Sequence, residues 1–251
     1  MVDMNTHRTR FAVDIVSEFI PPEKPSNKVV IFCAGMPTVP NRKELMKYIA
    51  KKGYWAVFPR YRGTWESGGE FLKEEPTKDI LDVMDHIDGK VFVGAWDKQE
   101  YRIENAEYYL LAGSFGGPAG LLLSKNPRVK KVIAVSPVVD WAAPSEDEPV
   151  DWMGGFVREA FGEGYRYTDE NWKKLGNGPF YNPVAQKEKV DGGKILFIHA
   201  KDDRSVLSGP VEQFAKEIGS EIILLKKGGH LSSSIVTSWK VLWKLKRFLR
   251  S

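Results

Sequence analysis

The sequence contains a single cysteine, Cys33, among its 251 residues. One cysteine cannot form an intrachain disulfide, and it excludes zinc sites built on cysteine pairs. No stretch approaches about 18 consecutive apolar residues, so no segment is expected to span a membrane. The polar first ten residues lack the apolar core of a secretory signal, and a cytoplasmic location is therefore the expectation.

Neither sign of charge dominates, because 37 basic residues face 33 acidic ones and both are spread along the chain. This balance argues against a nucleic-acid-binding surface. Only four histidines are present, and no His/Asp cluster has the spacing of metal ligands, so neither a metal nor another cofactor is expected. The 28% of charged residues and the scarcity of Gln and Cys favour a thermophilic source.

Apolar segments with the length of strands alternate with segments of helical periodicity. Strands are expected at residues 11–19, 29–33, 54–58, 107–112, 129–135, 195–199 and 221–225, and a hairpin at 91–103. Helices are expected at residues 42–52, 77–87, 117–124, 210–218 and 235–249. This alternation predicts an α/β fold with a mostly parallel central sheet and helices on both faces.

One segment interrupts the alternation. Residues 141–189 contain no clear strand and are rich in Trp, Gly and Pro. A structureless loop of this length is unusual in a compact domain, so helices are expected at residues 150–161 and 169–175. The chain is therefore expected to form a single domain over residues 1–251, with a small helical cap inserted at 141–189 over the carboxyl edge of the sheet.

The strongest local signal for chemistry is the segment AGSFGG at residues 112–117. It joins a predicted strand to a predicted helix by a tight turn that would hold the Ser114 hydroxyl above the sheet. The amide of Phe115 would lie at the start of the helix, where it could bind an oxyanion. The alternative interpretation is a glycine-rich turn with an incidental serine.

Serine is a weak nucleophile unless a base takes its proton. Among the four histidines, His7 is expected in the N-terminal tail, His86 on a helix surface and His199 in the core at the end of a strand. His230 follows a strand in a flexible Gly-Gly turn and can reach over the sheet edge. His230 is therefore the predicted base.

An imidazole base needs a carboxylate to fix its tautomer and to stabilise its cation. Asp202 and Asp203 directly follow the predicted strand at 195–199, at the sheet edge that carries Ser114. Asp140, which follows the strand at 129–135, is the next candidate. The chain order Ser, Asp, His is the order expected in one particular fold.

These segments resemble the α/β-hydrolase superfamily, and in particular the catalytic domain of prolyl oligopeptidase-type peptidases and small feruloyl or acyl esterases. Residues 112–117 are similar to the family's Gly-x-Ser-x-Gly-Gly elbow, with Ala112 in place of the first glycine. Residues 198–206 (IHAKDDRSV) resemble its Gly-x-x-Asp-x-x-Val segment, and this alignment selects Asp203 as the acid. The resemblance covers nearly the whole chain from Val29.

Three further segments carry the resemblance. Residues 34–37 (AGMP) resemble the loop after the third strand, which implies Met36 as the second oxyanion amide beside Phe115. Residues 59–69 (PRYRGTWESGG) are similar to a pocket-floor loop, in which Arg62 is expected to be structural. Residues 136–141 (SPVVDW) are expected to anchor the cap, which weakens Asp140 as the acid.

The resemblance implies a serine hydrolase with Ser114 as nucleophile, His230 as base and Asp203 as acid. A carboxylesterase acting on a small-molecule ester is predicted, and a peptidase or amidase acting on short peptides is the alternative. A non-enzymatic binding protein is disfavoured because all three catalytic roles are filled. Neither nucleic acid nor membrane is an expected partner, and a homo-oligomer is left open.

Aromatic residues in the loops and the insertion predict an apolar, aromatic pocket if they prove exposed, and helical core otherwise. They are Trp65, Trp141, Trp152, Phe156 and Trp172. The last predicted helix interleaves aromatic and basic residues. It is expected to cover the sheet with a solvated basic face rather than to contact a membrane.

Overall fold

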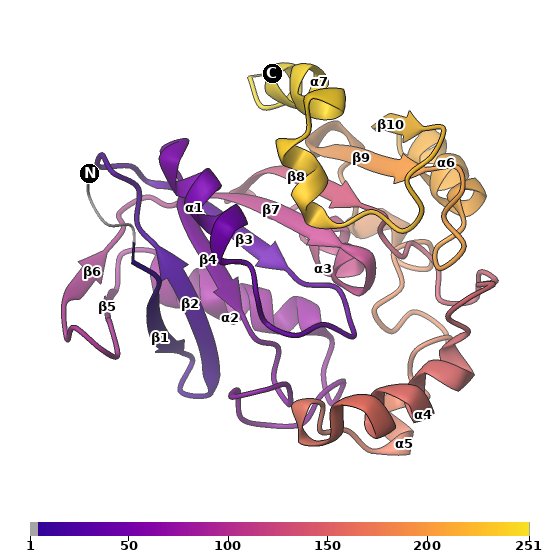
Figure 1. Ribbon diagram of the computed structural model, residues 1–251, viewed down its shortest axis with the longest axis horizontal. Helices are drawn as coiled ribbons and strands as arrows, with labels where there is room; N and C mark the ends of the chain where they lie inside the picture. The colour runs from indigo at the N-terminus through magenta and orange to yellow at the C-terminus, as the bar shows by residue number, and fades with distance from the viewer. Residues whose placement is uncertain (1–4, 251) are drawn as a thin grey trace.

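A computed structural model describes residues 5–250 (Figure 1). At its centre lies an eight-stranded sheet in the order β1-β2-β4-β3-β7-β8-β9-β10. The strands are β1 (His7–Phe11), β2 (Ile15–Ile20), β3 (Lys28–Cys33), β4 (Trp55–Pro59), β7 (Glu107–Gly113), β8 (Val129–Val135), β9 (Ile195–Ala200) and β10 (Glu221–Leu225). From β4 to β10 neighbouring strands pair in parallel, whereas β2 is antiparallel to both β1 and β4. The predicted mostly parallel sheet is confirmed.

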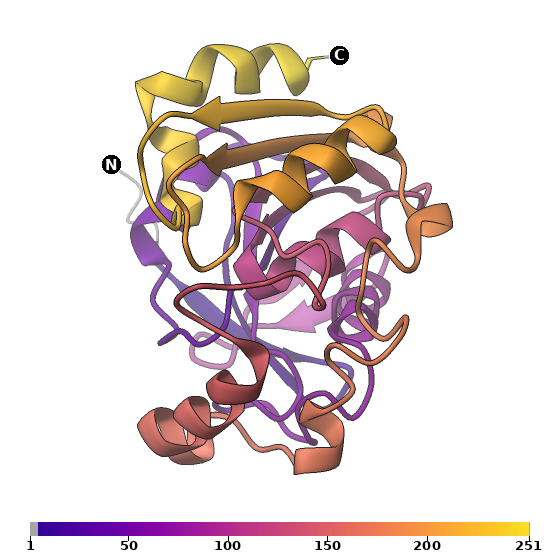
Figure 2. The ribbon, with the colours of Figure 1, turned by 90° about the vertical axis from the view of Figure 1, so that its right-hand side faces the viewer.

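Helices cover both faces of the sheet, as Figure 2 shows from the side. One face carries α1 (Lys43–Lys51) and α7 (Trp239–Phe248), and the other carries α2 (Pro76–Ile87), α3 (Gly117–Leu122) and α6 (Ser208–Glu217). The side chains of β3 explain why both faces of the sheet are covered. Successive residues of a strand point to opposite faces, so an apolar strand has side chains to bury on each side. Val29 and Ile31 belong to the core beneath α2 and α3, whereas Val30 and Phe32 belong to the core beneath α1 and α7.

Residues 141–189 lie between β8 and β9 and contain α4 (Val150–Phe161) and the short α5 (Asp169–Trp172). Both helices lie apart from the sheet (Figure 1). Three-residue 3-10 turns at Gly162–Gly164 and Lys187–Lys189 complete the segment. It is tied to the loop after β4, because Phe71 N–H donates to the Arg166 carbonyl and Arg166 N–H donates to the Gly63 carbonyl. All of these residues are described, and they include no strand of the sheet.

A hairpin of β5 (Val91–Val93) and β6 (Glu100–Arg102) forms where one was predicted. It lies beside β1, the edge strand of the main sheet (Figure 1). The Thr9 hydroxyl donates to the Val93 carbonyl at 2.8 Å. The Ala95 amide donates to the Arg8 carbonyl at 2.6 Å. The hairpin therefore covers part of an edge that would otherwise expose unpaired backbone groups.

Two sequence predictions of continuous elements are wrong. Residues 11–19 are not one strand, because a turn at residues 12–14 reverses the chain between β1 and β2, and Ala12 and Val13 take positive φ values of 46° and 71°. Residues 235–249 are not one helix. A 3-10 segment (Ser233–Thr237) ends at Ser238, whose hydroxyl accepts from the Lys240 amide and so begins α7 as a new helix. No helix within residues 5–250 is both long enough and apolar enough to cross a lipid bilayer.

Candidate active site

Ser114 stands on the sharp turn between β7 and α3, with a positive φ of 50°. A non-glycine residue rarely adopts this conformation, so the surrounding packing must enforce it. Two close approaches do so. A Cβ atom at Gly116 would lie 2.1 Å from the Cys33 carbonyl oxygen, and one at Gly117 would lie 2.4 Å from Pro137 Cβ. The glycines let the turn press against the end of β3 and the loop after β8, which leaves the Ser114 side chain partly exposed at the sheet edge.

His230 lies in the loop between β10 and the 3-10 segment, and this loop is anchored on both sides of the imidazole. The amides of Gly228 and Gly229 donate to Asp202 Oδ1 at 2.8 and 2.9 Å. On the other side, the Leu231 amide donates to the Ser136 hydroxyl at 3.1 Å. Asp202, the rejected candidate acid, thus shapes the histidine loop.

Asp203 is 2% exposed, and its carboxylate is hydrogen-bonded to the imidazole of His230. His230 Nδ1 lies 2.9 Å from Oδ2 and 3.1 Å from Oδ1 of this carboxylate. The amides of Ser205 and Val206 donate to Oδ1 at 3.1 and 3.0 Å. With its proton on Nδ1, the His230 ring has an unprotonated Nε2. His230 and Ser114 line the same cavity, but no hydrogen bond joins their side chains within residues 5–250.

Burial acts on both members of this pair. It tends to raise the pKa of Asp203, but hydrogen bonds from His230 and the Val206 amide outweigh it and hold that pKa below its ordinary range. Burial tends to lower the pKa of His230, whose side chain is 28% exposed. The hydrogen bond and charge of Asp203, together with the charge of Glu148, outweigh burial and raise the pKa of His230 above its ordinary value.

His199 is fully buried at the end of β9, as expected of a core histidine. Its Nε2 donates to the Val206 carbonyl at 2.8 Å and lies 3.4 Å from Asp203 Oδ2. Burial lowers the pKa of His199, so the ring is neutral. The neutral His199 imidazole and the His230 imidazole therefore both lie next to the Asp203 carboxylate. The sequence did not indicate that His199 would lie there.

Two cavities meet at Ser114. One, of about 260 Å³, is lined by Ser114, His230 and the 35–38 loop, together with Arg42, Glu148 and Ser232. The other, of about 50 Å³, is mainly apolar; Phe115, Trp141, Met153 and Val206 line it beneath α4. Met36 borders both. Among the loop and turn hydrogen bonds of residues 5–250, none has the Met36 or the Phe115 amide as its donor. Their role as oxyanion donors stays a prediction.

The aromatic residues that would form a pocket if exposed do not share one surface. Trp65 is half-buried and donates its indole N–H to the Thr38 carbonyl at 3.1 Å. Of the five aromatic residues proposed for that pocket, Trp141 lines the small cavity. Trp172 is 7% exposed and donates its indole N–H to the Val150 carbonyl, so it is core of the helical segment. Trp152 and Phe156 are 51% and 38% exposed and stack on each other on α4, at a ring separation of 4.8 Å.

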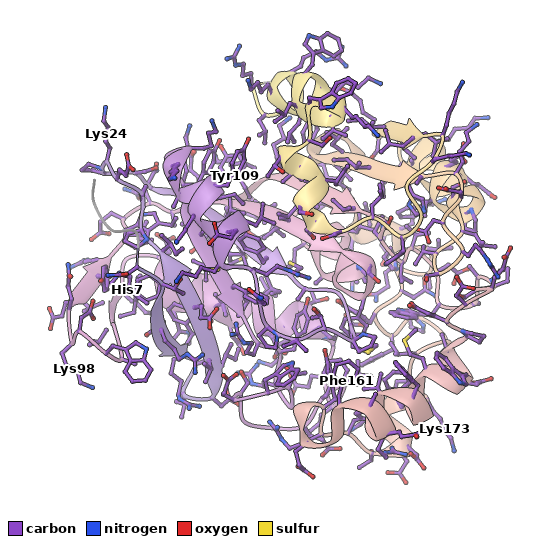
Figure 3. All side chains as sticks on the ribbon, in the orientation of Figure 1. His7, Lys24, Lys98, Tyr109, Phe161 and Lys173 are labelled. Carbon is purple, nitrogen blue, oxygen red and sulfur yellow. The ribbon has the colours of Figure 1, made fainter. Side chains whose placement is uncertain are left out.

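The other candidate residues lie elsewhere or have structural contacts. Asp140 Oδ1 accepts from the Ala142 amide and from Asn182 at 3.0 and 2.9 Å, which fits the predicted anchor of the inserted segment. His86 Nδ1 lies 2.7 Å from the Asp82 carbonyl. His7 is not part of a tail, because it belongs to β1, stacks on Phe19 and lies 2.9 Å from Asp97 (Figure 3).

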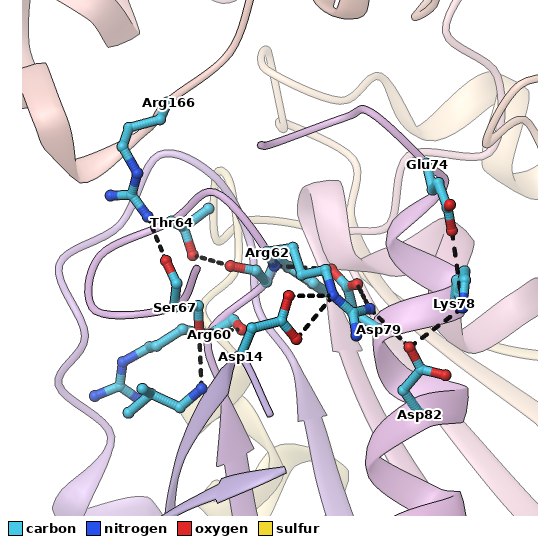
Figure 4. Close-up of polar contacts among 12 residues, drawn as sticks. Asp14, Arg60, Arg62, Thr64, Ser67, Glu74, Lys78, Asp79, Asp82 and Arg166 are labelled. Carbon is cyan, nitrogen blue, oxygen red and sulfur yellow. Dashed lines mark hydrogen bonds and ion pairs between the residues drawn. The ribbon is translucent and has the colours of Figure 1, made fainter. Parts of the chain in front are cut away.

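Arg62 holds the loop after β4 in place, as the resemblance implied (Figure 4). Its guanidinium contacts Asp14 at 2.9 Å and both Asp79 and Asp82 at 2.7 Å. Burial raises the pKa of Asp79 to about 6 despite these contacts. This ion cluster connects the turn before β2, the loop after β4 and α2, and none of its members lines either cavity at Ser114.

Sequence reasoning missed the role of Ser136. This buried residue follows β8 with a φ of 42° and accepts from the Leu231 amide, and it lies near enough to Asp203 to help lower the pKa of that carboxyl. It thus connects the acid to the histidine loop. The sequence indicated that Ser136 directly follows a strand, but not that it would contact the histidine loop. Within residues 5–250, no three His, Cys, Asp or Glu side chains are grouped so that they could hold a metal ion.

The sequence matches no family model, and no curated protein matches it significantly. Solved structures are similar over nearly the whole chain. An acylaminoacyl peptidase of Pyrococcus horikoshii is 22% identical with a TM-score of 0.62; the match covers 98% of this chain and 40% of the peptidase. Est1E of Butyrivibrio proteoclasticus, solved with ferulic acid bound, is 15% identical over 96% of this chain and 99% of its own, with a TM-score of 0.65.

An esterase of Pyrococcus furiosus is similar too. It is 15% identical over 98% of this chain and 89% of its own, with a TM-score of 0.61. The chain spans about 40% of the length of the peptidase and nearly all of Est1E. At these identities the likeness concerns the fold. The sheet order, the strand-turn-helix at Ser114 and these neighbours together show that the chain has the α/β-hydrolase fold.

Proposed function

We propose that this protein is a serine hydrolase that cleaves carboxylic esters through an acyl-enzyme on Ser114. The observation that carries the proposal is the paired arrangement at the sheet edge. His230 is hydrogen-bonded to the buried Asp203 at 2.9 Å, and the same histidine lines one cavity with Ser114. A base with its tautomer fixed by a carboxylate, facing a cavity with a strained serine, is the arrangement that activates an alcohol as a nucleophile.

In the acylation step, His230 Nε2 takes the hydroxyl proton while Ser114 Oγ bonds to the acyl carbon. The carbonyl oxygen becomes an oxyanion, which the amides of Met36 and Phe115 stabilise. Each such donor contributes roughly 2.7–4 kcal/mol to lowering the barrier. His230 then gives its proton to the leaving oxygen, the ester C–O bond breaks and the alcohol departs. Water, deprotonated by His230, attacks the acyl-enzyme, and the acid is released with Ser114 restored.

The volume of the apolar cavity points to short acyl groups. It measures about 50 Å³, whereas a cavity of about 150 Å³ is needed to hold a benzene ring. An acetyl or propionyl group fits this space, and an aromatic acyl group would require α4 to move. We therefore propose acetate and propionate esters as the preferred class.

A peptidase or amidase acting on short peptides is the second candidate, because an acylaminoacyl peptidase is among the structures with the same fold. The same nucleophile, base and oxyanion donors would serve an amide. The leaving group decides between the two activities, since an amine must be protonated before it can depart.

Labelling with a fluorophosphonate tests the proposal. We expect the wild type and a Ser232→Ala variant to be labelled and Ser114→Ala to be silent; Ser232 lines the same cavity and is the matched control. Turnover of p-nitrophenyl acetate should exceed that of the butyrate and octanoate esters. Release of a peptide anilide at a comparable kcat/KM would assign the amidase activity instead. A wild type that resists labelling, or a Ser114→Ala variant that is still labelled, would remove the hydrolase proposal.

A further inference from the structure

Arg42 introduces a positive charge into the larger cavity at Ser114. It is the residue before α1, and its side chain is half-buried. Its guanidinium donates to the Asn41 carbonyl at 3.4 Å, and none of the ion pairs among residues 5–250 includes it. Burial lowers the pKa of Arg42, because water is partly removed without a carboxylate to replace it. A partly desolvated guanidinium without a carboxylate partner is a site for an anion.

The two cavities at Ser114 can be assigned to the two halves of a substrate. His230 must reach the leaving atom to give it a proton, so the leaving group occupies the cavity that His230 lines. That cavity includes Arg42. The acyl group then occupies the small apolar cavity, which neither His230 nor Arg42 lines.

We infer that Arg42 binds a carboxylate on the leaving group, so that the preferred substrates are short-chain esters of hydroxy acids. This inference rests on the proposed function and adds the leaving half of the substrate to it. The cavity of about 260 Å³ is large enough for an aromatic ring that carries a carboxylate. A planar guanidinium suits this ligand, because it can donate two parallel hydrogen bonds to one carboxylate.

Glu148 is the competing charge in this cavity. It makes no ion pair with Arg42, and its charge raises the pKa of His230. Glu148 borders both cavities, whereas Arg42 borders only the one on the His230 side. Glu148 therefore lies near the junction where the reaction takes place, and Arg42 lies along the leaving group. A site governed by Glu148 would instead favour a cationic leaving group.

Two aryl acetates of one shape test the inference. In 4-acetoxybenzoate the leaving phenol carries a carboxylate, and in 4-acetoxybenzamide it carries a neutral amide. The measured quantity is the ratio of their kcat/KM values, each divided by the uncatalysed hydrolysis rate. We expect the wild type to favour the carboxylate by about tenfold to a hundredfold, the usual effect of a hydrogen bond to a charged group.

Three variants distinguish the effect of Arg42 on this ratio from the effect of the surrounding positive charge. Arg42→Gln should bring the ratio close to one, and Arg42→Lys should leave an intermediate value that falls with added salt. Lys43→Gln removes a neighbouring exposed charge that lines neither cavity, and it should keep the wild-type ratio. An equal ratio in wild type and Arg42→Gln would overturn the inference. So would a preference for 4-(aminomethyl)phenyl acetate, which would assign the cavity to Glu148.

A binding measurement keeps this test independent of turnover. Calorimetry with 4-hydroxybenzoate, the product, should show binding to the wild type that Arg42→Gln weakens about tenfold or more. 4-Hydroxybenzamide should bind both proteins equally. Failure of the wild type to hydrolyse either ester would contradict the proposed function. Failure of 4-hydroxybenzoate to bind more tightly than the amide would contradict the role of Arg42.

Discussion

Replacing Asp203 with asparagine should nearly abolish hydrolysis while leaving the protein folded. Oδ1 of Asp203 accepts the Ser205 and Val206 amides at 3.1 and 3.0 Å, and Oδ2 faces His230 Nδ1 at 2.9 Å. In Asp203→Asn the carboxamide oxygen is expected to keep the two backbone donors. Its NH2 group then faces His230, which must accept at Nδ1 and carry its proton on Nε2.

An imidazole protonated on Nε2 cannot take the Ser114 proton. A change to this tautomer lowers kcat by about 10⁴-fold in enzymes of this kind, which corresponds to about 5.4 kcal/mol of transition-state stabilisation. The assay is kcat for p-nitrophenyl acetate at constant pH, with the melting temperature as a check on folding.

Asp202→Asn is the matched control for this substitution. Asp202 accepts the Gly228 and Gly229 amides through Oδ1, and an asparagine oxygen can accept both. We expect kcat to stay within about threefold of the wild type, since surface substitutions rarely exceed about 0.5 kcal/mol. Activity of Asp203→Asn above a tenth of the wild type, or an equal loss in Asp202→Asn, would refute the assignment of Asp203.

Three further predictions concern the pH dependence of kcat/KM, the packing around Gly116 and the contribution of Ser136 to the position of the histidine loop. Neutral His230 is the active form and its pKa is raised, so the acid limb of kcat/KM should lie above pH 6.5, the ordinary histidine value. Glu148→Gln should move this limb to lower pH, and Asp147→Asn should not; an unmoved limb would exclude Glu148 as a cause. Gly116→Ala should cost at least about 3 kcal/mol, read as a lower melting temperature, because its Cβ would overlap the Cys33 carbonyl. Gly155→Ala, in an exposed and open turn of α4, should be neutral or stabilising. Ser136→Ala should lower kcat about tenfold with KM little changed, because Ser136 accepts from the Leu231 amide of the histidine loop and lowers the pKa of Asp203 but lines neither cavity; a rise in KM alone would contradict this role.

The sequence was sufficient for the parallel strands of the sheet and for the approach of Asp203 to His230 at their ends. Buried parallel strands appear as short apolar segments, and the turn chemistry at Ser114 and at the Gly-Gly-His segment is local. Parallel strands also bring their carboxyl ends to one edge, so residues far apart in sequence could be expected to meet there. Asp203 and His230 do meet, at 2.9 Å.

Local sequence patterns did not predict the features that depend on tertiary contacts. The turn at residues 12–14 has no glycine or proline, and the alternation of apolar residues continues through it, so nothing in the pattern indicated a reversal. Near the C-terminus, the helical periodicity continues through Ser238 and so concealed the cap at which a new helix begins. Arg42 was predicted only as part of a helix, because its place in the cavity depends on how the 35–38 loop and the histidine loop pack together.

The acid and the base are held in different ways, and this difference bears on catalysis. The Asp203 side chain is fully buried and accepts hydrogen bonds from His230 and two backbone amides, so its position is set when the protein folds. His230 stands on a Gly-Gly turn with 28% of its side chain exposed. The ring is therefore anchored at Nδ1 by the Asp203 carboxylate. In the proposed mechanism, a ring whose orientation is fixed before substrate arrives leaves little reorganisation for the proton transfers, so the barrier would be lowered by an environment that folding has already arranged.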